Sequence, residues 1–169
     1  MATIVEDKTR PKPISADGYE KFLSVAAIAL LGAVAAAVIR GRPEWHAVPW
    51  TIWAHLATII VALVLTPIIL LGRRGTPRHR VLGRIWAVSL IVTALISFDI
   101  RLSQHGHFSM IHLISVATLI LVPRIWWTAR HHQTVKHRRA VRGMVTGALL
   151  VAGFFTFPFD RLLGHWLFG

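Results

Sequence analysis

Histidine is the residue type in this sequence with the greatest capacity for chemistry, because ten histidines and no cysteine occur in 169 residues. The absence of cysteine excludes thiolate metal sites, iron–sulfur clusters and thiol catalysis. Four histidines share a spacing that occurs twice: His79 follows His55 after 24 residues, and His137 follows His112 after 25. A neutral imidazole is a common metal ligand, so these four residues are the candidate site.

The two pairs of histidines belong to a longer repeat. Each copy opens with His-Leu, at 55 or 112, and carries a proline 12 or 11 residues later. Each copy then reaches a His-Arg pair, at 79 or 137, and a glycine beside an arginine follows. This pattern predicts a duplicated helical hairpin whose two copies have the same orientation.

The elements that carry these residues are predicted to cross a membrane. The chain is 54% hydrophobic and only 15% charged, whereas soluble domains are about 45–50% apolar and about 25% charged. A membrane crossing needs about 20 apolar residues, and the sequence contains five such segments. They run approximately from Phe22 to Ile39, Val48 to Leu71, Val81 to Ile100, Phe108 to Thr128 and Ala140 to Phe157.

The basic residues predict the orientation of these segments. Fifteen Lys and Arg residues fall in the amino-terminal tail and in the second and fourth connections, whereas four fall on the other side. Because basic residues accumulate on the cytoplasmic side, we expect a cytoplasmic amino terminus and an external carboxyl terminus in a bacterial inner membrane. The net charge of +12 is therefore expected to set topology and contact anionic lipids, not nucleic acid.

The predicted fold class is all-α, with five transmembrane helices. A polar cytoplasmic tail (1–21) precedes a first transmembrane helix (22–40), and a short outer interfacial tail (160–169) ends the chain. Between them, residues 48–159 are predicted to form a four-helix membrane bundle from two hairpin repeats, about 48–100 and 108–159. The acidic residues expected near membrane depth are Asp99 and Asp160, both at the outer rim, so no buried carboxylate relay is predicted.

This topology places the four histidines in two pairs, one near each face of the membrane. His55 and His112 are predicted near the outer face, and His79 and His137 near the cytoplasmic face. Two histidines from facing helices are what bis-imidazole haem ligation in a helix bundle requires, so one or two b-type haems are expected. Arginines beside the inner pair are candidates to hold the haem propionates: Arg80, Arg84, Arg138 and Arg142. In the alternative interpretation, the histidines hydrogen-bond neighbouring carbonyls or lipid headgroups.

The residues from Trp53 to Met144 resemble a family of small uncharacterised bacterial membrane proteins. The resemblance rests on WAHLATIIVALVLTPIILLGRRGTPRHRVLGRIW, with its HRxxGRxW element, on FSMIHLIS and on HRRAVRGM. It implies a multi-span bacterial membrane protein. More distantly, the chain is similar to di-haem cytochrome b-type proteins with one histidine on each of four consecutive helices. That similarity implies that His55 pairs with His112 and His79 with His137, although the spacings are shorter here and the cytoplasmic pair lies at helix mouths.

Two functions remain open from the sequence. The first is a haem protein that passes electrons between a quinol or an external donor and a partner protein. The second is a cofactor-free accessory subunit or assembly factor of a larger energy-transducing membrane complex. We identify no set of catalytic residues. A small transporter is the least favoured class, because no discontinuous helix or buried charge is predicted.

Overall fold

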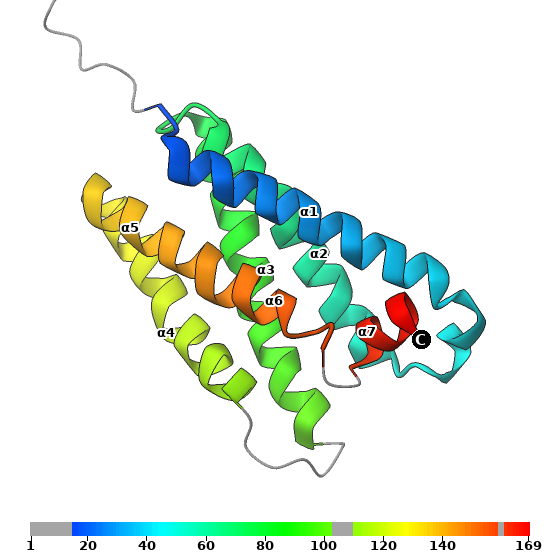
Figure 1. Cartoon of the computed structure of the whole chain (residues 1–169). Coiled ribbons are helices and arrows are strands. Elements are labelled where there is room, and N and C mark those ends of the chain that lie inside the picture. The colour runs from blue at the N-terminus through cyan, green and yellow to red at the C-terminus, as the bar shows by residue number, and fades with distance from the viewer. Residues whose placement is uncertain (1–14, 103–109, 159–160) are drawn as a thin grey trace, which may run out of the picture.

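The computed structural model describes residues 15–102, 110–158 and 161–169, and the side chains of residues 100–102 and 110–112 lie outside the description. Over these residues the chain is helical, as predicted, and contains no strand. The helices are α1 (Gly18–Arg40), α2 (Trp50–Leu71), α3 (Pro77–Leu102), α4 (Met110–Arg130), α5 (Thr134–Met144), α6 (Ala152–Phe154) and α7 (Leu162–Phe168). A 3₁₀ segment, η1 (Arg42–Ala47), follows α1, and a π-helical segment, η2 (Val145–Val151), joins α5 to α6 (Figure 1).

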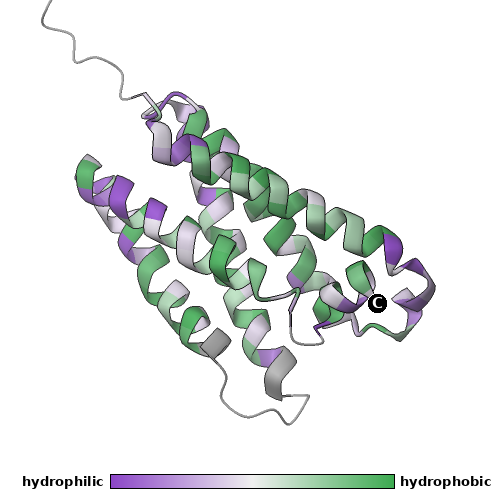
Figure 2. Cartoon of the chain, viewed as in Figure 1, coloured by the Kyte–Doolittle hydropathy of each residue, from purple (hydrophilic) through white to green (hydrophobic). Residues whose placement is uncertain are grey.

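Four helices are long and apolar enough to cross a membrane. They are α1, α2 and the apolar parts of α3 and α4. Large apolar side chains also cover their outer surfaces, since Val25 of α1 is 66% exposed and Ile120 of α4 is 65% exposed. Hydrophobic residues dominate the middle of these helices, and hydrophilic residues gather toward the ends (Figure 2). Such a surface suits contact with lipid, so the structure agrees with a membrane protein.

Helix α1 begins at Gly18, before the predicted start at Phe22, because a capping box precedes it. The Asp17 carboxylate accepts a hydrogen bond from the Glu20 backbone N–H at 3.0 Å, and the Asp17 backbone N–H donates to the Glu20 carboxylate at 3.2 Å. These reciprocal bonds satisfy two backbone donors at the helix start. Asp17 and Glu20, predicted to lie in the polar tail, therefore form the first turn of a membrane-length helix.

The predicted fifth apolar segment, from Ala140 to Phe157, is not a single α-helix of crossing length. It is divided among α5, η2 and α6, which follow one another without a break over residues 134–154. At the π-helical turn the Thr146 hydroxyl donates to the Arg142 carbonyl at 2.9 Å. A hydroxyl that bonds this carbonyl competes with the backbone ladder, and π-helical turns form where the regular ladder is locally shifted.

Each copy of the sequence repeat folds as two helices joined by a short turn. The turn between α2 and α3 contains Gly75 with φ +77°, and the turn between α4 and α5 contains His132 with φ +54°. Pro67 and Pro123 lie inside α2 and α4. The α2–α3 and α4–α5 turns lie at the same end of the molecule as the start of α1 (Figure 1). The arginine-rich connections therefore share one end of the structure.

The opposite end is closed by the carboxyl-terminal helix α7, which packs against α1. The Trp166 ring is 5% exposed, and its Nε1–H donates to the Glu44 carboxylate at 3.0 Å. Arg40 donates to the Leu167 carbonyl at 2.8 Å. A Cβ atom on Gly41 would lie 2.1 Å from the Trp166 ring, so glycine permits this close approach. Residues 159 and 160 at the start of the predicted outer tail lie outside the described residues.

Candidate functional site

His55 lies in the second turn of α2, and one of its ring nitrogens is held by α3. Its Nδ1 is 3.2 Å from the Ser97 hydroxyl oxygen, and that hydroxyl donates its only hydrogen to the Thr93 carbonyl at 2.8 Å. The Ser97 oxygen must therefore accept the hydrogen bond from Nδ1–H of His55. This network assigns the proton of the neutral imidazole to Nδ1 and leaves a lone pair on Nε2. A metal-ligating histidine characteristically donates its other ring N–H in this way.

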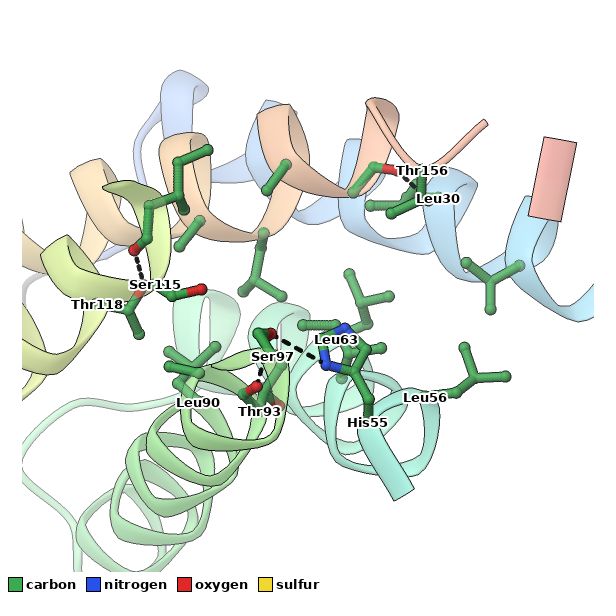
Figure 3. A pocket seen from close by; sticks show the side chains of 18 of the residues that line it. Leu30, His55, Leu56, Leu63, Leu90, Thr93, Ser97, Ser115, Thr118 and Thr156 are labelled. Carbon is green, nitrogen blue, oxygen red and sulfur yellow. Dashed lines mark hydrogen bonds between the residues drawn. The ribbon is translucent and has the colours of Figure 1, made fainter. Parts of the chain in front are cut away.

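His55 lines a cavity of about 130 Å³ between the helices. Figure 3 shows the imidazole directed into this space beside Ser97 and Thr93, with α1 and α4 on the other sides. Its walls are mostly apolar, with hydroxyl groups from α3, α4 and the end of the fifth segment. These hydroxyl residues are Thr93, Ser97, Ser115, Thr118 and Thr156. The cavity is thus an apolar space with one imidazole and a few hydroxyl groups in its wall.

The predicted outer partner of His55 is His112. Its backbone begins α4, but its side chain lies outside the described residues, so the pairing with His55 stays a prediction. Helix α4 does line the cavity, through Ile114, Ser115 and Thr118. The two helices that carry the predicted outer pair therefore wall the same space.

A haem matches this site in its donor chemistry but exceeds the enclosed volume. The His55 Nε2 lone pair is the donor that haem iron takes from an axial histidine. A site for a drug-sized molecule has roughly 300–1,000 Å³, whereas the cavity has about 130 Å³. The enclosed space in this structure is therefore smaller than a haem requires.

The inner pair of histidines lies at the end with the arginine-rich connections. The His137 Nδ1–H donates to the Ile125 carbonyl at 3.1 Å, which leaves its Nε2 with the lone pair, because a carbonyl only accepts. His79 lies in the first turn of α3 and His137 in the first turn of α5, and both helices begin at this end of the molecule (Figure 1). The structure thus brings this predicted pair into one region. Nδ1 of His79 is buried and has no hydrogen-bond partner among the described residues.

Two of the predicted propionate-binding arginines contact carboxylates of this chain instead. Arg138 donates to both oxygens of Glu20, with Nε 2.7 Å from Oε1 and Nη2 2.8 Å from Oε2. Arg142 donates to Glu20 at 3.2 Å and also pairs with Asp17. The other two predicted arginines, Arg80 and Arg84, are exposed on α3.

Glu20 is the centre of this charge cluster, and sequence reasoning missed it. Its side chain is 1% exposed, and Arg74 from the α2–α3 turn also donates to it. We call this group the Glu20 clasp: Asp17, Glu20, Arg74, Arg138 and Arg142. The sequence prediction considered Asp99 and Asp160 and did not include this buried carboxylate at the basic end of the molecule. The Asp17-Gly-Tyr-Glu20 capping box was the signal that could have placed Glu20 on a helix.

The Glu20 clasp also shifts the pKa of two of its members, Asp17 and Arg138. The Glu20 backbone N–H and the Arg142 guanidinium lower the pKa of Asp17 below its ordinary value of 3.8. The hydrogen bond from Arg138 to Glu20 raises the pKa of Arg138 above its ordinary value. Both groups therefore stay charged at neutral pH, and the clasp joins α1, the α2–α3 turn and α5 as an ionic network.

No family model matches the chain, and no curated protein or solved structure is similar to it.

Proposed function

We propose that this protein is a membrane haem protein that carries electrons, with His55 as an axial ligand of one b-type haem. The observation that carries the proposal is the hydrogen bond from His55 Nδ1–H to Ser97, which leaves the Nε2 lone pair in a cavity between membrane-length helices. Burial in an apolar helix bundle is the usual setting for such a ligand. When bound, the haem would supply a one-electron couple. A quinol is a suitable donor, because it is soluble in the bilayer.

The proposed second ligand is His112, which the sequence repeat makes the counterpart of His55. We place a single haem at His55 and His112, because the arginines of the inner region are less available to hold the propionates of a second haem. Arg138 and Arg142 are engaged with Glu20 and Asp17, so a propionate at that end would have to displace a carboxylate. A second haem on His79 and His137 is the less favoured form of the proposal.

The proposed topology has five crossings. The fifth comprises α5, η2 and α6, which are continuous over residues 134–154 and span about 30 Å at 1.5 Å per residue. The excess of Lys and Arg at one end favours a cytoplasmic amino terminus and an external carboxyl terminus. We place the protein in the inner membrane of a bacterium, in keeping with the family that the sequence resembles.

The test is a reduced-minus-oxidised absorption spectrum of the protein purified in mild detergent, with haem quantified by pyridine extraction. We expect a b-type spectrum that His55→Ala abolishes. His46→Ala is the matched control, because His46 is exposed in η1 and should leave the spectrum unchanged. The proposal would be refuted if the purified protein contained no extractable haem while the same cells loaded other b-type cytochromes with haem.

The Glu20 clasp favours a second candidate function, that of a cofactor-free accessory subunit or assembly factor of a larger energy-transducing membrane complex. In this case the arginines at the basic end hold the helices together and bind no cofactor, as their bonds to Glu20 suggest. Gentle solubilisation after cross-linking discriminates between the two. Recovery of this chain with the subunits of such a complex, and without haem, favours the accessory role, whereas a haem-loaded chain that migrates alone counts against it.

A further inference from the structure

Two buried nitrogen atoms at the basic end of the molecule have no hydrogen-bond partner among the described residues. They are Nη1 of Arg74 and Nδ1 of His79. Arg74 lies in the turn between α2 and α3, and His79 follows five positions later in the first turn of α3. Leaving a buried polar group without a partner costs about 1–3 kcal/mol, and more for a charged group. The guanidinium nitrogen needs an acceptor, and Nδ1 of His79 needs one too in the tautomer that carries the proton on Nδ1.

The carboxylates of the Glu20 clasp cannot supply that acceptor, because their oxygens are already occupied. Glu20 Oε1 accepts from Arg138 and Arg142, whereas Oε2 accepts from Arg74, from Arg138 and from the backbone of Asp17. Asp17 in turn accepts from the Glu20 backbone and from Arg142. The clasp also contains three guanidinium groups against two carboxylates, so positive charge remains in excess.

The surrounding connection adds more positive charge and no negative charge. Residues 72–84 contain no Asp or Glu, and four further arginines are exposed there: Arg73, Arg78, Arg80 and Arg84. The missing acceptor is therefore expected to be an anion from outside the chain. Arginine binds phosphoryl oxygens strongly, because its N–H groups match their geometry and charge.

The position of the two nitrogens at the ends of membrane-length helices indicates a lipid headgroup as the source of the anion. Arg74 lies between the last residue of α2, Leu71, and the first residue of α3, Pro77, and both helices are long enough to cross a membrane. Leu71 and Val81, on either side of the turn, are 51% and 52% exposed. Charged side chains beside exposed apolar ones are what the headgroup region of a bilayer accommodates. The Arg74 side chain keeps 20% of its surface exposed, whereas Nη1 itself is buried, so a phosphate reaches this atom only by displacing the side chains that cover it.

We propose that Arg74 and His79 form a binding site for the phosphate of an anionic lipid headgroup. The phosphate oxygens accept from Nη1 of Arg74 and from Nδ1–H of His79, while Nη2 of Arg74 keeps its bond to Glu20. The site would thus place a specific lipid against the turn that the Glu20 clasp holds. It lies at the end of the molecule opposite His55 and does not depend on the proposed haem.

The test measures lipid retained by the purified full-length protein, using native mass spectrometry after exchange into nanodiscs of phosphatidylglycerol, phosphatidylcholine or their mixtures. We expect preferential retention of phosphatidylglycerol, and a loss of about tenfold in its affinity for Arg74→Lys and for His79→Ala. Lysine keeps the charge and can keep a bond to Glu20 but has no counterpart of Nη1, so the fold should persist. Arg124→Lys, an exposed arginine of α4, is the matched control and should bind as the unmodified protein does.

Three further outcomes decide against the proposal. Equal retention of both lipids, or equal affinity in Arg74→Lys and Arg124→Lys, would show that any basic residue at this face suffices. Inorganic phosphate is the second arm: displacement of the lipid at millimolar phosphate would assign the site to a free phosphoryl anion and overturn the lipid assignment. Thermal unfolding of each variant in the same detergent verifies that lost binding does not reflect lost structure.

Discussion

Arg138 and Glu20 are 118 positions apart in the chain, and they meet through two parallel hydrogen bonds of 2.7 and 2.8 Å. Bidentate pairing of this kind is among the stronger polar interactions in proteins. Because Glu20 belongs to the first turn of α1 and Arg138 to α5, the pair joins the first long helix to the short helix that begins the fifth segment. Arg74 adds the α2–α3 turn to the same carboxylate. One buried carboxylate thus unites three separate parts of the basic end.

Replacement of Glu20 by glutamine should strongly destabilise the protein. The amide leaves Arg74 without its carboxylate and leaves Arg138 and Arg142 with Asp17 as their remaining counter-charge. Loss of one partner from a buried ionic group costs about 3–5 kcal/mol. We expect a clear fall in the thermal unfolding midpoint in detergent. Glu44→Gln is the control, because the Glu44 side chain is 51% exposed and exposed pairs contribute about 0–1 kcal/mol. Equal midpoints for the two variants would contradict a central role for Glu20.

The contribution of Asp17 to stability should depend on pH in the acid range. Its backbone bond to Glu20 and its pairing with Arg142 lower the pKa of Asp17 in the folded protein below the ordinary value of 3.8. A lowered folded pKa gives stability that is complete above the unfolded value and is lost as the pH falls through the folded value. The melting difference between the unmodified protein and Asp17→Asn should therefore be constant down to about pH 5 and narrow below about pH 4. Asparagine retains the capping oxygen, so the comparison isolates the charge, and a difference that stays constant to pH 3 would argue against this linkage.

The long helices could be predicted because a crossing needs about 20 apolar residues and the chain contains such runs. The predicted segment from Val48 to Leu71 and the observed helix Trp50–Leu71 end at the same residue. The fifth segment differs from the prediction because its backbone turns π-helical over Val145–Val151, which divides the segment. Hydropathy reports the apolar character of a segment and not such a change of backbone geometry.

The charge cluster was harder to predict than the helices. Glu20 meets Arg74, Arg138 and Arg142 across 54, 118 and 122 residues, and no local pattern encodes pairings at those separations. The arginines were recognised as binding groups, but a haem propionate was expected where the structure has a carboxylate of the same chain. Conversely, the position of His55 near the start of a membrane-length helix followed directly from the sequence. The tautomer of His55 could not be predicted in the same way, because it depends on Ser97, which lies 42 residues away in the chain.

Removal of the Ser97 hydroxyl should weaken the proposed haem site without abolishing it. Ser97 accepts from Nδ1–H of His55 and so sets the tautomer and the ring orientation, and loss of such a partner typically costs 10–100-fold in metal affinity. We expect Ser97→Ala to retain less haem and to shift its midpoint potential, measured by redox titration. Ser89→Ala is the control, because Ser89 bonds only the Ile85 carbonyl of its own helix. An unchanged occupancy and potential in Ser97→Ala would exclude this positioning role.

Substitution of Gly41 by alanine should detach the carboxyl-terminal helix from α1. The added Cβ would lie 2.1 Å from the Trp166 ring, and this ring is 5% exposed and bonded to Glu44, so it has little freedom to withdraw. Overpacking of this kind costs about 1–3 kcal/mol. We expect a lower unfolding midpoint and faster proteolysis within α7.

Gly32→Ala is the matched control, because no atom lies within 4 Å of a Cβ at Gly32. That substitution should be neutral or slightly stabilising in a helix. In Gly41→Ala/Trp166→Leu the smaller side chain should relieve the contact and recover part of the lost stability. Equal proteolysis of the two glycine variants would mean that α7 is not held by this contact.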